Sequence, residues 1–246
     1  MNLTPAVLKK SIEAKGYVWY NDRPNLVAIR TTLQVPDVFN DLFVMCWKQP
    51  ELPVGLDLLN TQRWLNDFLY DGENGKELVE DGAAGKNTTF ALANLNSTIG
   101  MYRLKSYVIT TDPGLYWLNH PLSKLGAAVL KPGQYVNAYQ LGLHQGKKEH
   151  PALIQTGGYV TVYRDFDRDN IAEETNVQET GHFGINIHRA SATGATTRIG
   201  KFSAGCTVFS KKTDHDEVLM LCGHYKQQVK NLFTYTLLRE KELLSV

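Results

Sequence analysis

Two neighbouring stretches decide how this chain is interpreted, GINIHRA (Gly184–Ala190) and GKFSAGCTVF (Gly200–Phe209). A loop rich in Ser, Thr and Gly joins them. The two stretches place His188 at the end of an apolar segment and Cys206 directly after a glycine. An isolated thiol has a pKa of about 8.5 and is mostly protonated at neutral pH. A neighbouring imidazole can take that proton, and the pair is sufficient for acyl transfer through a thioester. The sequence therefore predicts Cys206 as nucleophile and His188 as general base, provided that the two residues meet.

The residues around this pair predict the rest of an acyl-transfer site. Gly205 allows a sharp backbone turn, so that the amides of Gly205 and Cys206 point at one spot and form an oxyanion hole. A backbone carbonyl directly after the histidine is placed to orient the imidazole. The expected substrate contacts are Arg189, Ser203 and His182. For the first two, a solvated loop cation and a turn hydroxyl are equally open interpretations.

The alternative interpretation of the cysteine and histidine is structural. Free cysteine is among the most buried residue types, so Cys206 could be a core residue and His188 a hydrogen-bonded histidine of a strand. The ordered spacing and the glycine before Cys206 favour the catalytic interpretation. Cys46 and Cys222 lie in apolar segments and are predicted to be core residues. An odd number of cysteines in a chain of this length does not indicate a disulfide framework.

The composition argues against several classes of protein. The 246 residues include 26 Lys and Arg against 25 Asp and Glu, so no global field favours nucleic acid or an acidic membrane surface as a partner. There is no run of about eighteen apolar residues, so membrane insertion is not expected. The first residues, MNLTPAVLKKS, lack an apolar h-region, which predicts a protein made in the cytoplasm without a signal peptide. The oligomeric state stays open.

Short strands dominate the predicted elements. A helix is expected from Thr4-Pro5 to Gly16, and apolar spacing predicts helices over 60–70 and 214–230. Residues 71–97, rich in Gly, Asn and acids, are expected to form an exposed insertion. Many short strands with few peripheral helices predict a mainly β sandwich or barrel-like domain. The expected strands are 17–20, 26–32, 42–47, 101–110, 127–130, 135–141, 152–155, 160–164, 184–188, 207–210 and 232–238.

A family resemblance follows from these motifs. His188, the spacer after it and SAGC (Ser203–Cys206) resemble the active-site signature of the L,D-transpeptidase (YkuD-type) peptidoglycan enzymes, which carry a histidine, a similar spacer and then Ser/Thr-His-Gly-Cys. TTDPG (Thr110–Gly114) is similar to the Thr-Pro-x-Gly turn that precedes the family's substrate groove. The helix and strand expected after the cysteine correspond to the family's closing elements.

The resemblance implies a mainly β fold, an L,D-transpeptidase-like β-sandwich with a few peripheral helices. Residues 1–37 are then an N-terminal helix and strands packed on the domain. Residues 38–246 are the catalytic domain, with an insertion near 50–97.

The implied activity is cysteine acyl transfer on a peptidoglycan stem peptide, without a cofactor, at the carbonyl of an L-centre in the third residue. The missing export signal favours hydrolysis, as an L,D-carboxypeptidase or endopeptidase that reaches the cell wall after release or injection, like a phage lysin or an effector. The alternatives are an L,D-transpeptidase that forms cross-links, and a non-catalytic cell-wall-binding or virion module.

Two departures from the family pattern limit what the resemblance implies. Ala204 stands where most members have histidine, and Thr207-Val208-Phe209 replaces the usual arginine or asparagine shortly after the cysteine. The nucleophile and the base are kept, so an acyl-enzyme is still expected. The carboxylate clamp and the acceptor preference do not follow from the resemblance.

The signals for a metal site are weak. Residues Asp165–Asn170 are similar to the start of a calcium-binding loop, but position six is Asn170 rather than Gly and position twelve is Asn176 rather than Glu. A polar turn between strands is the preferred interpretation. The histidines outside the motif show no metal-ligand spacing, which argues against a zinc hydrolase. No metal and no cofactor are predicted.

Overall fold

The computed structural model describes residues 3–33, 35–145 and 149–244. The chain divides into two compact units, one made of Met1–Cys46 and Leu104–Val246, the other of Trp47–Arg103. The insertion expected near 50–97 falls within the second unit. The strands that carry the motif residues belong to the first.

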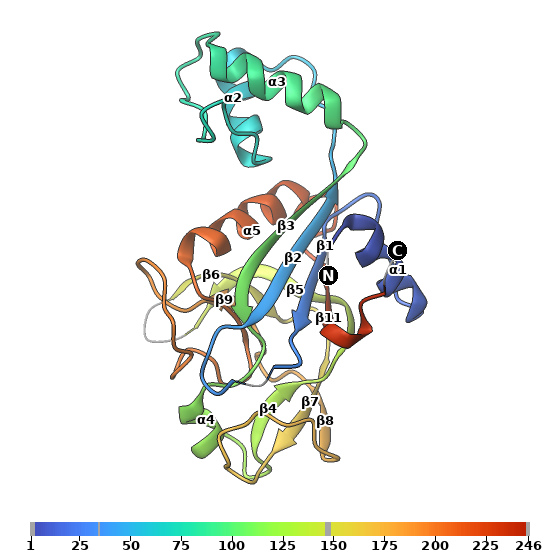
Figure 1. The fold of residues 1–246 in the computed structure, drawn as a ribbon, viewed down its shortest axis with the longest axis vertical. Helices are drawn as coiled ribbons and strands as arrows, with labels where there is room; N and C mark the ends of the chain where they lie inside the picture. The colour runs from blue at the N-terminus through green and yellow to red at the C-terminus, as the bar shows by residue number, and fades with distance from the viewer. Residues whose placement is uncertain (1–2, 34, 146–148, 245–246) are drawn as a thin grey trace. The chain divides into compact units, whose positions relative to one another are not determined.

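Most strands of the first unit form one sheet that closes on itself, in the order β1-β11-β5-β6-β9-β10-β3-β2 (Figure 1). The mainly β prediction is confirmed. Of the predicted sandwich and barrel-like alternatives, the structure has the barrel, whereas the family resemblance implied a sandwich. The barrel closes because β1 pairs in parallel with β11 and antiparallel with β2 and so joins the two edges. The strands are β1 (Asn25–Arg30), β2 (Asp41–Lys48), β3 (Tyr102–Thr110), β5 (Gly133–His144), β6 (His150–Gln155), β9 (Ile187–Arg189), β10 (Thr207–Phe209) and β11 (Phe233–Arg239).

A second, smaller sheet has the order β4-β7-β8 and lies beside the short helix α4 (Figure 1). Its strands are β4 (Ala127–Leu130), β7 (Val160–Asp165) and β8 (Gln178–Gly181), and α4 is Leu115–Asn119. The longer helix α5 (Lys212–Tyr225) packs on β5, β6, β9 and β10. Within the described residues, no helix is long and apolar enough to span a membrane.

Aromatic side chains fill the barrel. The ring of Phe43 lies 4.9 Å from that of Phe209 and 6.2 Å from that of Tyr235, and the ring of Tyr139 lies 5.3 Å from that of Tyr235. The Thr207 hydroxyl bonds to the Tyr235 hydroxyl at 2.7 Å. Thr207 and Phe209 on β10 therefore point into the barrel. Because side chains alternate along a strand, the residues next to them point outward.

The N-terminal residues 1–37 do more than pack on the domain, because they supply β1 to the barrel. The predicted helix is α1 (Pro5–Ala14), with the Thr4 hydroxyl accepting the Val7 amide at 3.2 Å. The predicted strand 17–20 is wrong: its backbone bonds to side-chain amides, with Val18 N–H donating to Gln134 Oε1 and Gln134 Nε2 donating to Val18 O, each at 2.8 Å.

The second unit has its own small core. Its helices α2 (Leu58–Asp67) and α3 (Lys86–Thr98) pack together around buried Leu65 and Leu95. Buried Gln62 links α2 to the loop before α3, donating to Asp81 and Ala83 and to the hydroxyl of Thr88. Helix α3 lies where residues 71–97 were expected to be only an exposed insertion. The remaining element, η1 (Glu240–Glu242), is a short turn near the C-terminus of the first unit.

Candidate active site

The pairing of β9 with β10 brings the two halves of the motif together. The strands run parallel, with His188 opposite Val208, and the Thr207 amide donates to the Asn186 carbonyl at 3.0 Å. Paired residues of neighbouring strands project from the same face, and Thr207 points into the barrel, so His188 and Cys206 both belong to the outer face. Both residues line one cavity of about 460 Å³. The structure thus places the predicted nucleophile and base in one site.

The ring of His188 is held by a hydrogen bond to the backbone. Its Nδ1 lies 2.9 Å from the Arg189 carbonyl, which can only accept, so Nδ1 carries the proton and Nε2 is the basic nitrogen. This confirms the predicted orienting carbonyl after the histidine. Among the described residues, Nε2 is buried without a hydrogen-bond partner. Burial, followed by the neighbouring His144, lowers the pKa of His188 to about 3, so the imidazole is neutral at neutral pH.

The Cys206 thiol is almost enclosed, with 8% of the residue exposed. Its Sγ donates to the Gly184 carbonyl at 3.4 Å. Burial raises the pKa of the thiol to about 11, so it is protonated at rest. The resting site therefore holds a neutral thiol and a neutral imidazole, and a nucleophilic thiolate forms only when a proton is transferred. Cys46 and Cys222 are both fully buried free cysteines, which confirms their prediction as core residues.

The turn before Cys206 depends on glycine and serine. Gly205 has φ +120°, and a Cβ there would lie 2.4 Å from the Ala128 carbonyl oxygen. Any other residue at this position would therefore have a strained backbone and a side chain that clashes with Ala128. The Ser203 hydroxyl accepts the Gly205 amide at 3.2 Å and donates to the Cys206 carbonyl at 2.9 Å. The Gly205 amide is thus already engaged by the Ser203 hydroxyl. An oxyanion role for Gly205 requires that bond to be released, whereas the Cys206 amide needs no such change.

The turn Thr110–Gly114 supports the loop that leads to the cysteine. The Gly114 amide donates to the Ser203 carbonyl at 2.9 Å. A Cβ on Gly114 would lie 2.1 Å from the Gly200 carbonyl oxygen, so the two segments are in backbone contact. This turn therefore fixes the loop that carries the nucleophile.

The three predicted substrate contacts lie outside the set of residues that line the cavity. Ser203 is fully buried and holds the turn. Arg189 is half-buried, and its Nη1 donates to the Ser191 carbonyl at 2.7 Å. His182 is exposed, its ring meeting that of Tyr159 edge-on at 4.7 Å. Their role as substrate contacts stays a prediction.

A residue that the sequence analysis did not single out is His144. Its ring stacks on that of His188, with centroids 4.0 Å apart and an angle of 11° between the planes. The Asn186 side-chain nitrogen lies 2.9 Å from His144 Nδ1, and His144 lines the cavity. The β5–β6–β9 ladder brings it there, since β5 pairs with β6 and Leu153 of β6 pairs with Ile187. No sequence spacing signals this contact between residues 44 positions apart.

Two further histidines surround the base. The His150 ring lies 5.7 Å from that of His188. Buried His215 comes from α5 and packs 5.4 Å from the Phe209 ring. Burial, as the largest cause, lowers the pKa of His215 to about 4. The cluster is therefore a set of mostly uncharged rings, and it is not a group of converging ligand atoms in the described part of the chain.

The walls of the cavity come from both sheets and from α4. The lining includes the paired residues Ala128 of β4 and Arg164 of β7, Trp117 of α4, and Phe183 and Lys201 from the loops. The lining includes two cations and, among the described residues, no Asp or Glu. Sequence spacing gave no indication that Arg164 and the cysteine share a site.

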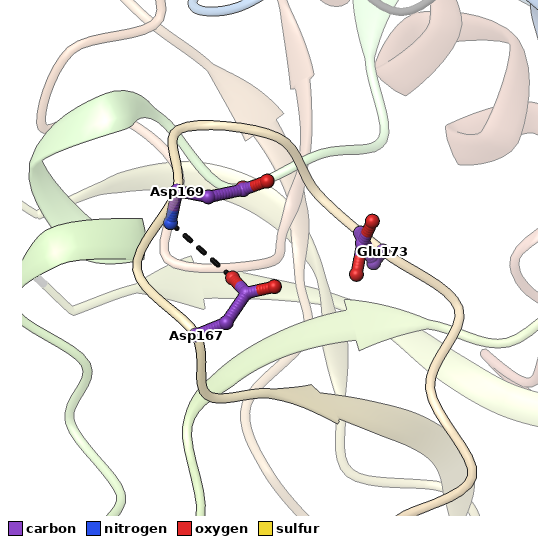
Figure 2. A group of neighbouring side chains, drawn as sticks. All are labelled: Asp167, Asp169 and Glu173. Atoms are coloured by element: carbon purple, nitrogen blue, oxygen red, sulfur yellow. Dashed lines mark hydrogen bonds between the residues drawn. The ribbon is translucent and has the colours of Figure 1, made fainter.

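An acidic group lies on the loop that follows β7 (Figure 2). Carboxylate oxygens of Asp167, Asp169 and Glu173 lie within 4.8 Å of one another, and the Asp169 amide donates to Asp167 Oδ1 at 3.2 Å. All three side chains are exposed. Exposed carboxylates are common on polar turns, and the position-six glycine and position-twelve glutamate of a calcium loop are absent here. The group stays assigned to a polar turn.

The candidate site rests on four observations within the first unit. These are the shared cavity, the oriented imidazole, its unpartnered Nε2 and the glycine turn that presents the thiol. No family model, curated protein or solved structure matches this chain.

Proposed function

We propose that this protein is a cysteine acyl-transfer enzyme that hydrolyses peptidoglycan stem peptides through a thioester. The observation that supports this most strongly is the Nε2 atom of His188, buried and without a partner among the described residues, in a cavity that also contains Cys206. A buried nitrogen without a partner is costly, and a role as proton acceptor in the cavity that Cys206 also lines accounts for it. The substrate class comes from the resemblance of the motif to L,D-transpeptidases.

The proposed reaction begins with transfer of the Cys206 thiol proton to His188 Nε2. The thiolate attacks the peptide carbonyl, the C–N bond breaks, and the imidazolium returns the proton to the leaving amine. His188 next takes a proton from water, which attacks the thioester carbonyl. The C–S bond then breaks, the new carboxylic acid is released, and the proton restores the thiol.

The resting pKa values bear on the first proton transfer of this proposed reaction. The thiol pKa of about 11 and the His188 pKa of about 3 make proton transfer between the two resting side chains unfavourable. The products of that transfer are a thiolate and an imidazolium, whose mutual attraction in a poorly hydrated cavity offsets part of this cost. We infer that proton transfer accompanies attack on a bound carbonyl rather than preceding it.

Cross-link formation is the second candidate. It uses the same thioester but an amine instead of water as the acceptor. The third candidate is a non-catalytic module, which is favoured by a resting thiol that donates to Gly184 instead of to His188. These candidates differ in products, so one experiment separates them.

Purified muropeptides incubated with the protein and analysed by mass spectrometry test the proposal. We expect released terminal residues or split cross-links from the wild type, and no products from Cys206→Ala or His188→Gln. Cys222→Ala is the matched control, because it removes a buried cysteine of α5 that lies outside the cavity. It is expected to retain the products.

Each of the other product patterns would support a different one of the three candidates. A new cross-linked dimer that requires Cys206 would replace hydrolysis by transfer. Identical product patterns from the wild type and Cys206→Ala, or no products from either, would remove the enzyme proposal and leave the binding module. Folding of each variant is checked by circular dichroism before the comparison.

A further inference from the structure

The cavity that holds Cys206 and His188 has a charge bias that the acyl-transfer chemistry does not need. Its lining includes Arg164 and Lys201 but no carboxylate among the described residues. Attack by a thiolate needs a base and an oxyanion site, not two side-chain cations. The cations therefore point to a negatively charged group on the molecule that enters.

Arg164 is built into the wall rather than lying loosely on the surface. Its side chain is 9% exposed, and its Nε donates to Glu179 Oε2 of β8. Its guanidinium lies 5.0 Å from the centre of the Phe183 ring. A guanidinium has five N–H donors, and Nε uses one of them here. The other four, on Nη1 and Nη2, have no acceptor among the described residues.

The position of Arg164 relative to the cysteine follows from the register of the second sheet. Arg164 of β7 is the antiparallel partner of Ala128 of β4. Ala128 in turn contacts the turn before the nucleophile, because a Cβ on Gly205 would lie 2.4 Å from the Ala128 carbonyl oxygen. Paired residues on antiparallel strands have Cβ atoms about 5 Å apart, so Arg164 lies one strand away from the turn that carries Cys206.

Lys201 adds a second cation to the lining of the cavity. Its ammonium lies over the Tyr116 ring, 3.9 Å from the centre, and its carbonyl accepts the Trp117 indole N–H at 3.1 Å. It pairs with no carboxylate among the described residues. The segment after the cysteine cannot supply a cation, because Thr207, Val208 and Phe209 carry none and are fully buried.

We propose that Arg164, assisted by Lys201, forms a carboxylate subsite, and that the substrate carries a free carboxylate within one residue of the bond that Cys206 attacks. The paired Nη groups match the two oxygens of a carboxylate, a bidentate arrangement that lysine and neutral side chains do not reproduce. Glu179 holds the guanidinium in place from Nε. This inference rests on the proposed function for its scissile bond, but not for the binding of a carboxylate.

Two carboxylates of a stem peptide could occupy this subsite: the terminal one of the leaving residue, and the side-chain one of the residue that supplies the scissile carbonyl. Three tetrapeptides test them: the unmodified peptide, its terminal carboxamide, and its side-chain carboxamide at the third residue. We expect one of the two carboxamides to lower kcat/KM at least about tenfold, as loss of a charge-assisted bidentate bond does. The affected carboxamide identifies the carboxylate.

Variants connect this discrimination to Arg164. Arg164→Gln is expected to abolish the preference, so that kcat/KM for the carboxylate and the carboxamide peptide become nearly equal. Arg164→Lys is expected to keep part of the wild-type preference for the carboxylate. Lys131→Gln is the matched control, because Lys131 is a cation next to β4 that bonds to Gln178 and does not line the cavity, and it is expected to keep the discrimination. Equal rates for all three peptides, or discrimination that survives in Arg164→Gln, would overturn the subsite.

A binding measurement separates failure of the subsite from failure of the proposed function. Cys206→Ala is titrated with the same three peptides by calorimetry, with and without Arg164→Gln. Arg164-dependent preference for the carboxylate without any turnover by the wild type would retain the subsite and reject the peptidase. Turnover without this preference in either assay would retain the peptidase and reject the subsite.

Discussion

At the residue scale, the central feature is that the proposed nucleophile, Cys206, and the proposed base, His188, are both neutral and both nearly enclosed. Burial, and not an ion pair, sets their resting state, raising the pKa of the Cys206 thiol to about 11 and lowering that of His188 to about 3. Many cysteine nucleophiles instead rest as thiolates beside a cation. We therefore expect Cys206 to react slowly with small electrophiles until a substrate is bound.

Alkylation tests this expectation. Iodoacetamide should modify Cys206 slowly at neutral pH, because a thiol with a pKa of about 11 carries roughly 300-fold less thiolate there than an unperturbed one. The rate should rise about tenfold per pH unit up to the limit of stability of the fold. Peptide mass mapping distinguishes Cys206 from Cys46 and Cys222. Fast labelling that is already maximal at neutral pH would show instead that the thiolate is the resting form.

The stacked histidine makes a second prediction at this scale. His144→Ala removes the ring that covers one face of His188 at 4.0 Å, and kcat/KM is expected to fall about tenfold because the base loses its fixed position. His144→Phe keeps the ring and should retain most of the activity. Both variants should shift the acid limb of the pH profile of kcat/KM to higher pH, since His144 helps to lower the pKa of His188. An unchanged rate and pH profile in His144→Ala would exclude the positioning role.

At the element scale, the loop between β9 and β10 depends on a single backbone conformation. Gly205→Ala places a methyl group against the Ala128 carbonyl at a residue with φ +120°. We expect a loss of stability of about 2 kcal/mol or more and loss of activity, because the turn that presents Cys206 must shift. Urea denaturation and the muropeptide assay measure the two effects.

Gly223→Ala is the matched control for that prediction. Gly223 lies in α5, has a backbone conformation outside the positive-φ region, and has open space where the Cβ would be. This substitution should raise stability by up to about 1 kcal/mol, since alanine is the better helix former. If Gly205→Ala were as well tolerated as Gly223→Ala, the glycine turn would not be needed to hold the nucleophile.

Elements with a strong local signal could be predicted, and elements that depend on distant partners could not. Helix α1 follows from Thr4-Pro5 and its apolar spacing, and β7 follows from its β-branched and aromatic residues. Strand β4 follows from an apolar run between Gly126 and the turn residues Pro132-Gly133. The segment 17–20 has a strand composition, but the side chain of Gln134 satisfies its backbone where a strand would otherwise pair. Strand β8 (Gln178–Gly181) is polar and is held by its pairing with β7, so its composition gives no signal.

At the scale of the whole molecule, closure of the barrel joins segments from opposite ends of the chain. Leu26 of β1 pairs with Tyr235 of β11, and no pattern within either strand specifies that partner. Sequence reasoning could therefore identify a mainly β chain but not whether its sheets close or stack. The same limit applies to the site. His188 and Cys206 were found because the motif is local, whereas His144 and Arg164 reach the cavity only through the ladders of β5–β6 and β4–β7.

The buried histidines link the site to the stability of the molecule. Burial lowers the pKa of His215 from 6.5 to about 4, so the unfolded chain binds a proton there that the folded chain excludes. Stability is then fully present above the unfolded pKa and is lost as the pH falls from 6.5 toward 4. Asp112 and Asp165 affect stability in the opposite sense, because burial raises the pKa of each carboxyl to about 6. Their contribution to the free energy of unfolding is present at low pH and is lost as the pH rises through about 6.

Substituting the histidine isolates its contribution from these opposing groups. His215→Gln cannot titrate, whereas both aspartates and His188 are common to the two proteins and cancel in the comparison. The stability of the wild type relative to His215→Gln should fall by up to about 3 kcal/mol between neutral pH and pH 4. Urea unfolding at a series of pH values measures the difference. Parallel stability curves for the two proteins would show that His215 is protonated in the folded state, and hence that the region between α5 and the barrel admits charge.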